Sequence, residues 1–140
     1  MSPITARRLL AAYAVLLAVV FLWPAGDAPS RAVDLLTAGV RTLGVDPRLA
    51  HPAIVEVLAN VAITVPLAVL GRLGWPASPW WQWALLGLAV GVGAESAQAL
   101  LLPDRFASPV DVVANTLGVA LGAGLAAPAA RRRHARATGV

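Results

Sequence analysis

The stretch from Gly91 to Gly124, GVGAESAQALLLPDRFASPVDVVANTLGVALGAG, places polar side chains at helical spacing inside two apolar runs. Glu95 and Gln98 lie near the end of the first run, and Asp111 and Asn115 lie near the start of the second. Polar groups inside such runs are costly in a membrane, so they are expected to serve structure or function. The short segment between the runs predicts a tight connection between two helices.

The composition is typical of a membrane protein. The chain has 140 residues, of which 59% are hydrophobic and 13% are charged, whereas about 25% are charged in an ordinary soluble domain. It has no cysteine, which excludes disulfide and thiol chemistry. The net charge is +4, but the basic residues flank apolar runs and form no patch interleaved with aromatic residues. We therefore expect no nucleic-acid partner and a single membrane domain over residues 1–140.

Four apolar runs are long enough to cross a bilayer, which takes about 20 residues. Unalternating runs of this length form helices, because a helix satisfies its own backbone hydrogen bonds in lipid. The predicted fold is all-α, a bundle of four transmembrane helices. The predicted spans are 9–26, 54–71, 81–102 and 110–130, followed by an arginine-rich tail at 131–140.

Basic residues predict how these spans are oriented. Seven arginines fall on the side that holds both termini, namely Arg7, Arg8, Arg72, Arg131, Arg132, Arg133 and Arg136. The other four are Arg31, Arg41, Arg48 and Arg105. By the positive-inside rule both termini are expected in the cytoplasm. All seven carboxylates belong to the opposite side or to the outer half of the spans.

Aromatic residues mark one end of the third span. Four tryptophans cluster where it begins, as an interfacial aromatic belt would: Trp75, Trp80, Trp81 and Trp83.

The connection over residues 27–52 is the one sizeable segment outside the spans. Val33, Leu36, Val40 and Leu43 recur at helical spacing, which indicates a short amphipathic segment on the outer face. A solvated loop with one helical turn fits the same residues.

The acids and amides of the last three spans converge on one predicted polar site in the outer leaflet. Its candidate residues are Glu56, Asn60, Glu95, Gln98, Arg105, Asp111 and Asn115. They suit the binding of a polar ligand, and we assign no catalytic residue, no metal and no cofactor.

Glu95 is the least easily explained of these residues by structure alone. It lies roughly 10 Å inside the outer end of its span, where an ionised acid costs about 2.5–3.5 kcal/mol, so a functional role is the first hypothesis. The structural alternative is a lock to Gln98 or Arg105. For Asp111 the alternative is a capping box with Ser108, in which Pro109 takes the first helical position.

Small residues and one proline predict how the helices pack. Gly87 and Gly91 precede Glu95 at four-residue steps, and Gly118 and Gly122 continue the face of Asn115, which permits close contact between helices. Pro66 is expected to kink the second span and to release backbone carbonyls toward the bundle interior.

These residues resemble the VanZ-like family of small bacterial membrane proteins. The resemblance rests on Asn60 with Pro66-Leu67, and on Glu95, Gln98, Pro103, Arg105, Asp111, Asn115, Gly118 and Gly122. It implies a four-helix protein of the bacterial plasma membrane, related to an accessory factor associated with reduced sensitivity to teicoplanin, a glycopeptide antibiotic.

Several functions fit these features. The preferred interpretation is a cell-envelope protein whose polar site binds a membrane lipid or a lipid-linked cell-wall precursor. A membrane enzyme acting on a lipid-linked phosphate or ester is an alternative, although no histidine belongs to the predicted cluster. Ion-coupled transport and a purely structural or interaction role are the others.

Overall fold

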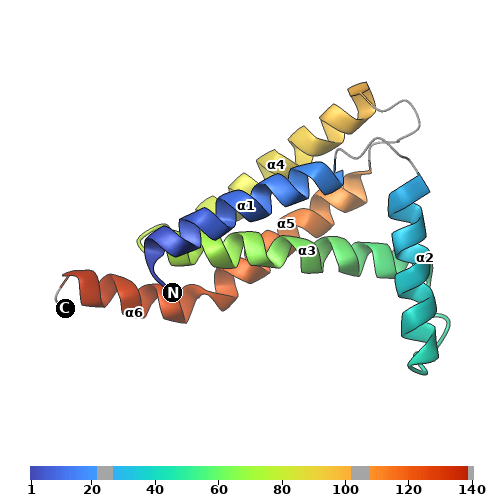
Figure 1. Cartoon of the computed structure of the whole chain (residues 1–140), viewed down its shortest axis with the longest axis horizontal. Helices are drawn as coiled ribbons and strands as arrows, with labels where there is room; N and C mark the ends of the chain where they lie inside the picture. Colours follow the sequence, from blue (N-terminus) through green and yellow to red (C-terminus); the bar gives the residue numbers. More distant parts are fainter. Residues whose placement is uncertain (22–26, 102–107, 139–140) are drawn as a thin grey trace.

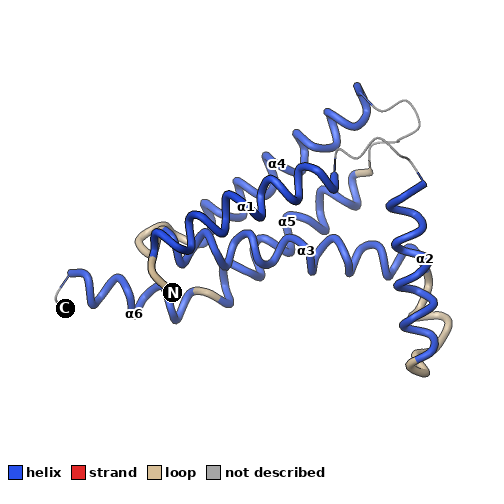
Figure 2. The backbone as a smooth tube through the Cα atoms, in the orientation of Figure 1, coloured by secondary structure: helices blue, strands red, loops and turns tan. Residues whose placement is uncertain are grey.

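The computed structural model describes residues 1–21, 27–101 and 108–138 of the chain, and these ranges form helices with no strand (Figure 1). The helices are α1 (Pro3–Phe21), α2 (Asp27–Thr42), α3 (Pro52–Gly74), α4 (Trp80–Leu101), α5 (Pro109–Leu125) and α6 (Ala127–Thr138). The backbone trace shows α1, α3, α4 and α5 running along one another, with α2 turned across them (Figure 2).

Among the described residues, three helices are long and apolar enough to cross a membrane. These are α1, α3 and α4, with mean hydropathies of 1.6, 2.2 and 1.5 over Pro3–Val20, Pro52–Gly74 and Trp80–Leu101. Helices α5 and α6 are long and apolar enough only when the two are counted as one span. The all-helical class predicted from sequence is therefore confirmed, with three or four candidate spans. Helix α1 begins at Pro3, earlier than the predicted start at residue 9.

The predicted span over 110–130 is not one straight helix, because α5 and α6 meet at a bend of 44°. Pro128 has no N–H for the helical bond to the Gly124 carbonyl, and its ring crowds that carbonyl. The Gly124 carbonyl instead accepts a hydrogen bond from the N–H of Ala126, which also donates to Gly122. The arginine-rich tail continues as α6 to Thr138.

Helices α3 and α5 form the most extensive contact and run in the same direction. A Cβ atom added at Gly118 would collide with the Thr64 hydroxyl and the Val61 carbonyl, and one at Gly122 would collide with the Val65 carbonyl. Glycine at these two positions therefore lets the backbones of α5 and α3 touch.

Helix α4 packs against α5, and near the start of α4 the contact includes larger side chains such as Trp83 and Val119. A Cβ atom added at Gly87 would lie 2.8 Å from Val119, and the Trp83 ring covers Gly71 of α3. Trp83 is buried in a small core with Ala68, Val119 and Ala123. Its assignment to the aromatic belt is therefore wrong, whereas Trp75, Trp80 and Trp81 are exposed.

Helix α1 is attached to α3 by polar contacts in the middle of α3 and at its C-terminal end. The Tyr13 hydroxyl donates to the Ile63 carbonyl at 2.6 Å, next to the Ala62 carbonyl, which loses its helical partner because Pro66 has no N–H. Near the N-terminus, Arg7 Nε donates to the Gly74 carbonyl at 2.9 Å. The Arg7 guanidinium also stacks over Trp75.

Helix α2 has 16 residues and lies across the end of the bundle where α3 begins, so the expectation of a loop with one helical turn is wrong (Figure 1). It contacts α3. Thr37 is buried and Val33 and Val40 are half-buried, while Leu36 and Leu43 are exposed. Arg41 Nε donates to the Ala50 carbonyl at 3.0 Å, which fixes the end of α2 near the start of α3.

We predict that Gly118→Ala lowers the stability of the protein by about 1–3 kcal/mol, because the added methyl group forces α5 away from α3. The matched control is Gly124→Ala on the same helix, where a Cβ atom meets nothing within 4 Å. Thermal unfolding in detergent measures both variants. Equal melting temperatures for Gly118→Ala and Gly124→Ala would contradict the close contact.

Candidate functional site

Most of the predicted polar residues lie at the end of the bundle where α4 ends and α5 begins. Glu95 and Gln98 are buried in α4, at 8% and 6% exposure, and Asn115 is buried in α5 at 7%. Asn60 and Asp111 are half-buried. Glu56 is exposed on the first turns of α3, and Arg105 falls outside the described residues.

Glu95 connects α4 to the first turn of α5. Its Oε2 atom accepts a hydrogen bond from the backbone N–H of Ser108 at 2.6 Å. Ser108 is the N-cap of α5, so this carboxylate lies at the positive end of the helix dipole. Both the hydrogen bond and the dipole stabilise a buried negative charge, which offsets part of the cost of placing an acid there.

The capping box predicted for Ser108 and Asp111 is only half present. The Ser108 hydroxyl accepts a hydrogen bond from the N–H of Asp111 at 3.3 Å, and Pro109 occupies the first turn. The reciprocal bond to the Ser108 N–H comes from Glu95, which sequence reasoning missed. The partner belongs to another helix, and no local spacing identifies it.

Asp111 instead faces α3. Its Oδ1 atom accepts a hydrogen bond from Asn60 Nδ2 at 2.8 Å. One turn further along α3, the Thr64 hydroxyl donates to the Asn60 carbonyl at 2.9 Å and lies against Gly118. The acids of α4 and α5 therefore each join two helices, Glu95 within the α4–α5 hairpin and Asp111 across to α3.

Asn115 follows Asp111 by one turn and has a different environment. Its Oδ1 atom is buried and has no hydrogen-bond partner among the described residues. A buried polar atom without a partner costs about 1–3 kcal/mol, so such an atom calls for an explanation.

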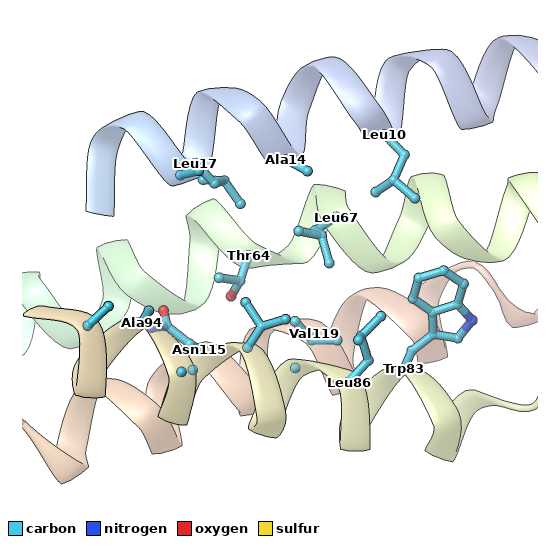
Figure 3. Close-up of a pocket in the computed structure, with 16 residues that line it drawn as sticks. Leu10, Ala14, Leu17, Thr64, Leu67, Trp83, Leu86, Ala94, Asn115 and Val119 are labelled. Atoms are coloured by element: carbon cyan, nitrogen blue, oxygen red, sulfur yellow. The ribbon is translucent and has the colours of Figure 1, made fainter. Parts of the chain in front are cut away.

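An apolar groove passes this asparagine, with a volume of about 450 Å³. Leu10 and Leu17 of α1 form one side, α4 forms the other, and α3 and α5 form the floor (Figure 3). Thr64 and Asn115 are the polar side chains that line it. On α4 the lining includes Ala94, the residue before Glu95, so the groove reaches the level of this buried acid.

Sequence reasoning did not predict the groove. The groove lies between α1 and α4 because α1 packs mainly on α3, while α4 packs mainly on α5. The small residues of α4 that face it, such as Gly91, Gly93 and Ala97, are the signal in the sequence that points to it.

The arrangement supplies hydrogen-bond acceptors in an apolar setting. Among the described residues, Glu95 accepts a bond from Ser108 through Oε2 and Asp111 accepts one from Asn60 through Oδ1, and a carboxylate can accept several. Among the described residues, no three histidines, cysteines or acids lie close enough to hold a metal ion. The Ser96 hydroxyl donates to its own helix at Val92.

Long apolar helices with buried polar residues at one end define a small polytopic helical membrane protein. A family model described as VanZ/LLP1 matches residues 10–130, which is most of the chain. The chain therefore belongs to the VanZ/LLP1 family, and the resemblance seen in the sequence is confirmed. Neither the curated proteins nor the solved structures contain a match to it.

We predict that Asn60 and Asp111 are energetically coupled, because their side chains share the 2.8 Å hydrogen bond. A double-mutant cycle of Asn60→Ala and Asp111→Ala should give a coupling energy of about 0.5–2 kcal/mol in detergent unfolding. The control cycle pairs Asn60→Ala with Ser96→Ala, whose hydroxyl bonds its own helix. Additive effects in both cycles would show that the bond does not contribute.

Proposed function

We propose that this VanZ-family protein binds an envelope lipid or a lipid-linked cell-wall precursor. The lipid tail occupies the groove between α1 and α4, and the headgroup lies at the polar end near Glu95 and Asp111. The observation that carries this proposal is the groove itself, an apolar channel of about 450 Å³ with the unpartnered Asn115 oxygen in its wall.

The proposal includes a membrane orientation. Helices α1, α3 and α4 are three spans, and the bent pair α5–α6 supplies the fourth. The arginine-rich end with both termini lies in the cytoplasm of a bacterial cell, and the polar end lies in the outer leaflet of the plasma membrane. Helix α2 then lies on the outer surface, with Leu36 and Leu43 exposed toward lipid. The positive-inside rule supports this choice.

The shape and chemistry of the site match an amphiphile. A lipid tail that leaves the bilayer loses van der Waals contacts with neighbouring tails, so it binds a protein groove only where the groove walls replace these contacts. Leu10, Leu67 and Leu86 line the groove and provide such contacts. A hydroxyl or amide N–H at the head of that tail would donate to Asn115 Oδ1. Amines of a headgroup or of a precursor peptide would bind the carboxylates, and Arg105 would bind a phosphate.

This proposal gives a physical route to altered glycopeptide sensitivity, the effect that the family resemblance implies. A protein that holds a cell-wall precursor changes how much of it is exposed to a glycopeptide. Binding by the polar end also gives a role to an acid placed within the membrane.

A structural role for the acids is the second candidate, and specific contacts favour it. Glu95 fixes the start of α5, and Asp111 fixes α5 to α3. In this case the polar residues set the register of the helices and the groove is filled by bulk lipid.

We predict that Ala94→Phe abolishes retention of a specific lipid, because the ring fills the groove beside Glu95. Native mass spectrometry of the purified protein identifies the lipid that wild type retains. The matched control is Ala89→Phe on an exposed face of the same helix, which is not part of the groove. Equal lipid retention by the two variants, or no specific lipid on wild type, would contradict the proposal.

We predict that Glu95→Gln separates binding from structure. The glutamine oxygen still accepts the Ser108 N–H, so the free energy of unfolding changes by less than about 1.5 kcal/mol. Removal of the charge weakens binding of an amine-bearing headgroup by about tenfold, measured by lipid titration at matched protein level. If binding is unchanged while Glu95→Leu unfolds the protein, the structural role is correct.

A further inference from the structure

A second pocket lies at the opposite end of the bundle, near the two termini, with a volume of about 510 Å³. Arg72 from the end of α3 lines it, together with Arg131 and His134 of α6. The loop from Pro76 to Trp80 forms the remaining wall. The pocket thus combines two guanidinium groups from different helices, and it is separate from the groove and from Glu95.

Arg72 is buried to an unusual degree for an arginine, at 6% exposure. Its Nε atom has no hydrogen-bond partner among the described residues. By contrast, Nε of Arg7, at the same end, donates to the Gly74 carbonyl. A buried guanidinium with an unmet donor is costly, and the cost falls when an anion provides acceptors.

The chain segments that form this end contain no acidic side chain. Residues 1–26, 57–94 and 112–140 contain no aspartate and no glutamate. These segments supply all of α1, most of α3 and α4, and all of α6. Every residue that lines the pocket comes from these segments, so the two arginines have no acid among the other lining residues.

The wall formed by the loop from Pro76 to Trp80 is held in place by hydrogen bonds within the protein. The Ser78 hydroxyl donates to the Trp75 carbonyl at 2.7 Å and accepts from Trp83 Nε1 at 2.8 Å. Pro76 and Pro79 restrict the same loop. A ligand therefore does not have to order this wall, which lowers the entropic cost of binding.

We propose that this pocket binds a phosphate group, with Arg72 and Arg131 as its ligands. The planar guanidinium matches the oxygens of phosphate in a bidentate geometry, and two arginines from α3 and α6 can hold one anion between them. The exposed Trp80 at the rim is typical of the membrane interface, where lipid phosphates lie. The phosphate is either the headgroup of an anionic lipid or a free ion.

The test uses full-length protein, freed of lipid in neutral detergent, and follows its melting temperature. The ligands are short-chain phosphatidylglycerol, phosphatidylcholine of the same chain length, and inorganic phosphate. We expect phosphatidylglycerol to stabilise the protein more than phosphatidylcholine, whose headgroup cation is repelled by the arginines. Stabilisation by phosphatidylglycerol alone assigns the site to a lipid headgroup, and stabilisation by inorganic phosphate as well assigns it to the free ion too. Stabilisation by neither anion overturns the proposal.

Arg131→Gln should weaken the binding of phosphatidylglycerol by about tenfold or more, because hydrogen bonds to charged groups are the strong ones. The matched control is Arg132→Gln, which removes the same charge one residue along α6 and does not line the pocket. An equal loss in both variants would show general attraction to a basic surface and would overturn the site.

Arg72→Met provides a second test, because general attraction of lipid to the basic surface would not depend on this buried side chain. Without ligand it should melt at or above wild type, since it removes a buried cation, and it should lose the response to phosphatidylglycerol. A full response in Arg72→Met overturns the proposal. Ala94→Phe should keep the thermal response to phosphatidylglycerol, because Ala94 lies in the groove and not in this pocket. The experiment therefore distinguishes failure of the phosphate site from failure of lipid binding in the groove.

Discussion

Contact between the backbones of α3 and α5 organises the rest of this protein. At Gly118 and Gly122 the α5 backbone lies against carbonyls of α3 and beside the Thr64 hydroxyl, so the two helices approach closely. This pair forms the floor on which α1 and α4 are placed, one on each helix. The groove between α1 and α4, and the reach of Asn60 to Asp111, both follow from that spacing.

The two ends of the bundle handle buried charge in opposite ways. At the end with the acids, Glu95 and Asp111 find donors within the protein, a backbone N–H at the start of α5 and an amide on α3. At the other end, Arg72 is equally buried, and the segments around it contain no acid. The acids of the first end have their hydrogen-bond donors inside the protein, whereas the anion proposed for the second end would come from outside.

Long apolar runs predicted the helices well, because hydrophobic length alone determines what can cross a bilayer. The expected spans 54–71 and 81–102 lie close to α3 and α4, whose bounds are Pro52–Gly74 and Trp80–Leu101. The partner of Glu95 was not predictable, since a backbone N–H carries no side-chain signature. Likewise, the sequence places Pro128 near the end of the predicted span 110–130, and the structure shows a 44° bend between α5 and α6 there. Burial of Trp83 and Arg72 depends on Gly71 and on α6, which no local pattern reveals.

Separation of charge along the bundle has an electrical consequence. Seven arginines belong to α1, to the end of α3 and to α6 at one end of the bundle, while Glu56, Glu95 and Asp111 lie at the other end. The molecule is therefore a dipole parallel to its helices. A voltage across a membrane does work on such a dipole, about 2.3 kcal/mol for each elementary charge moved through 100 mV. An energised membrane thus favours one of its two orientations, with the arginines on the negative side, and the bias disappears when the voltage collapses.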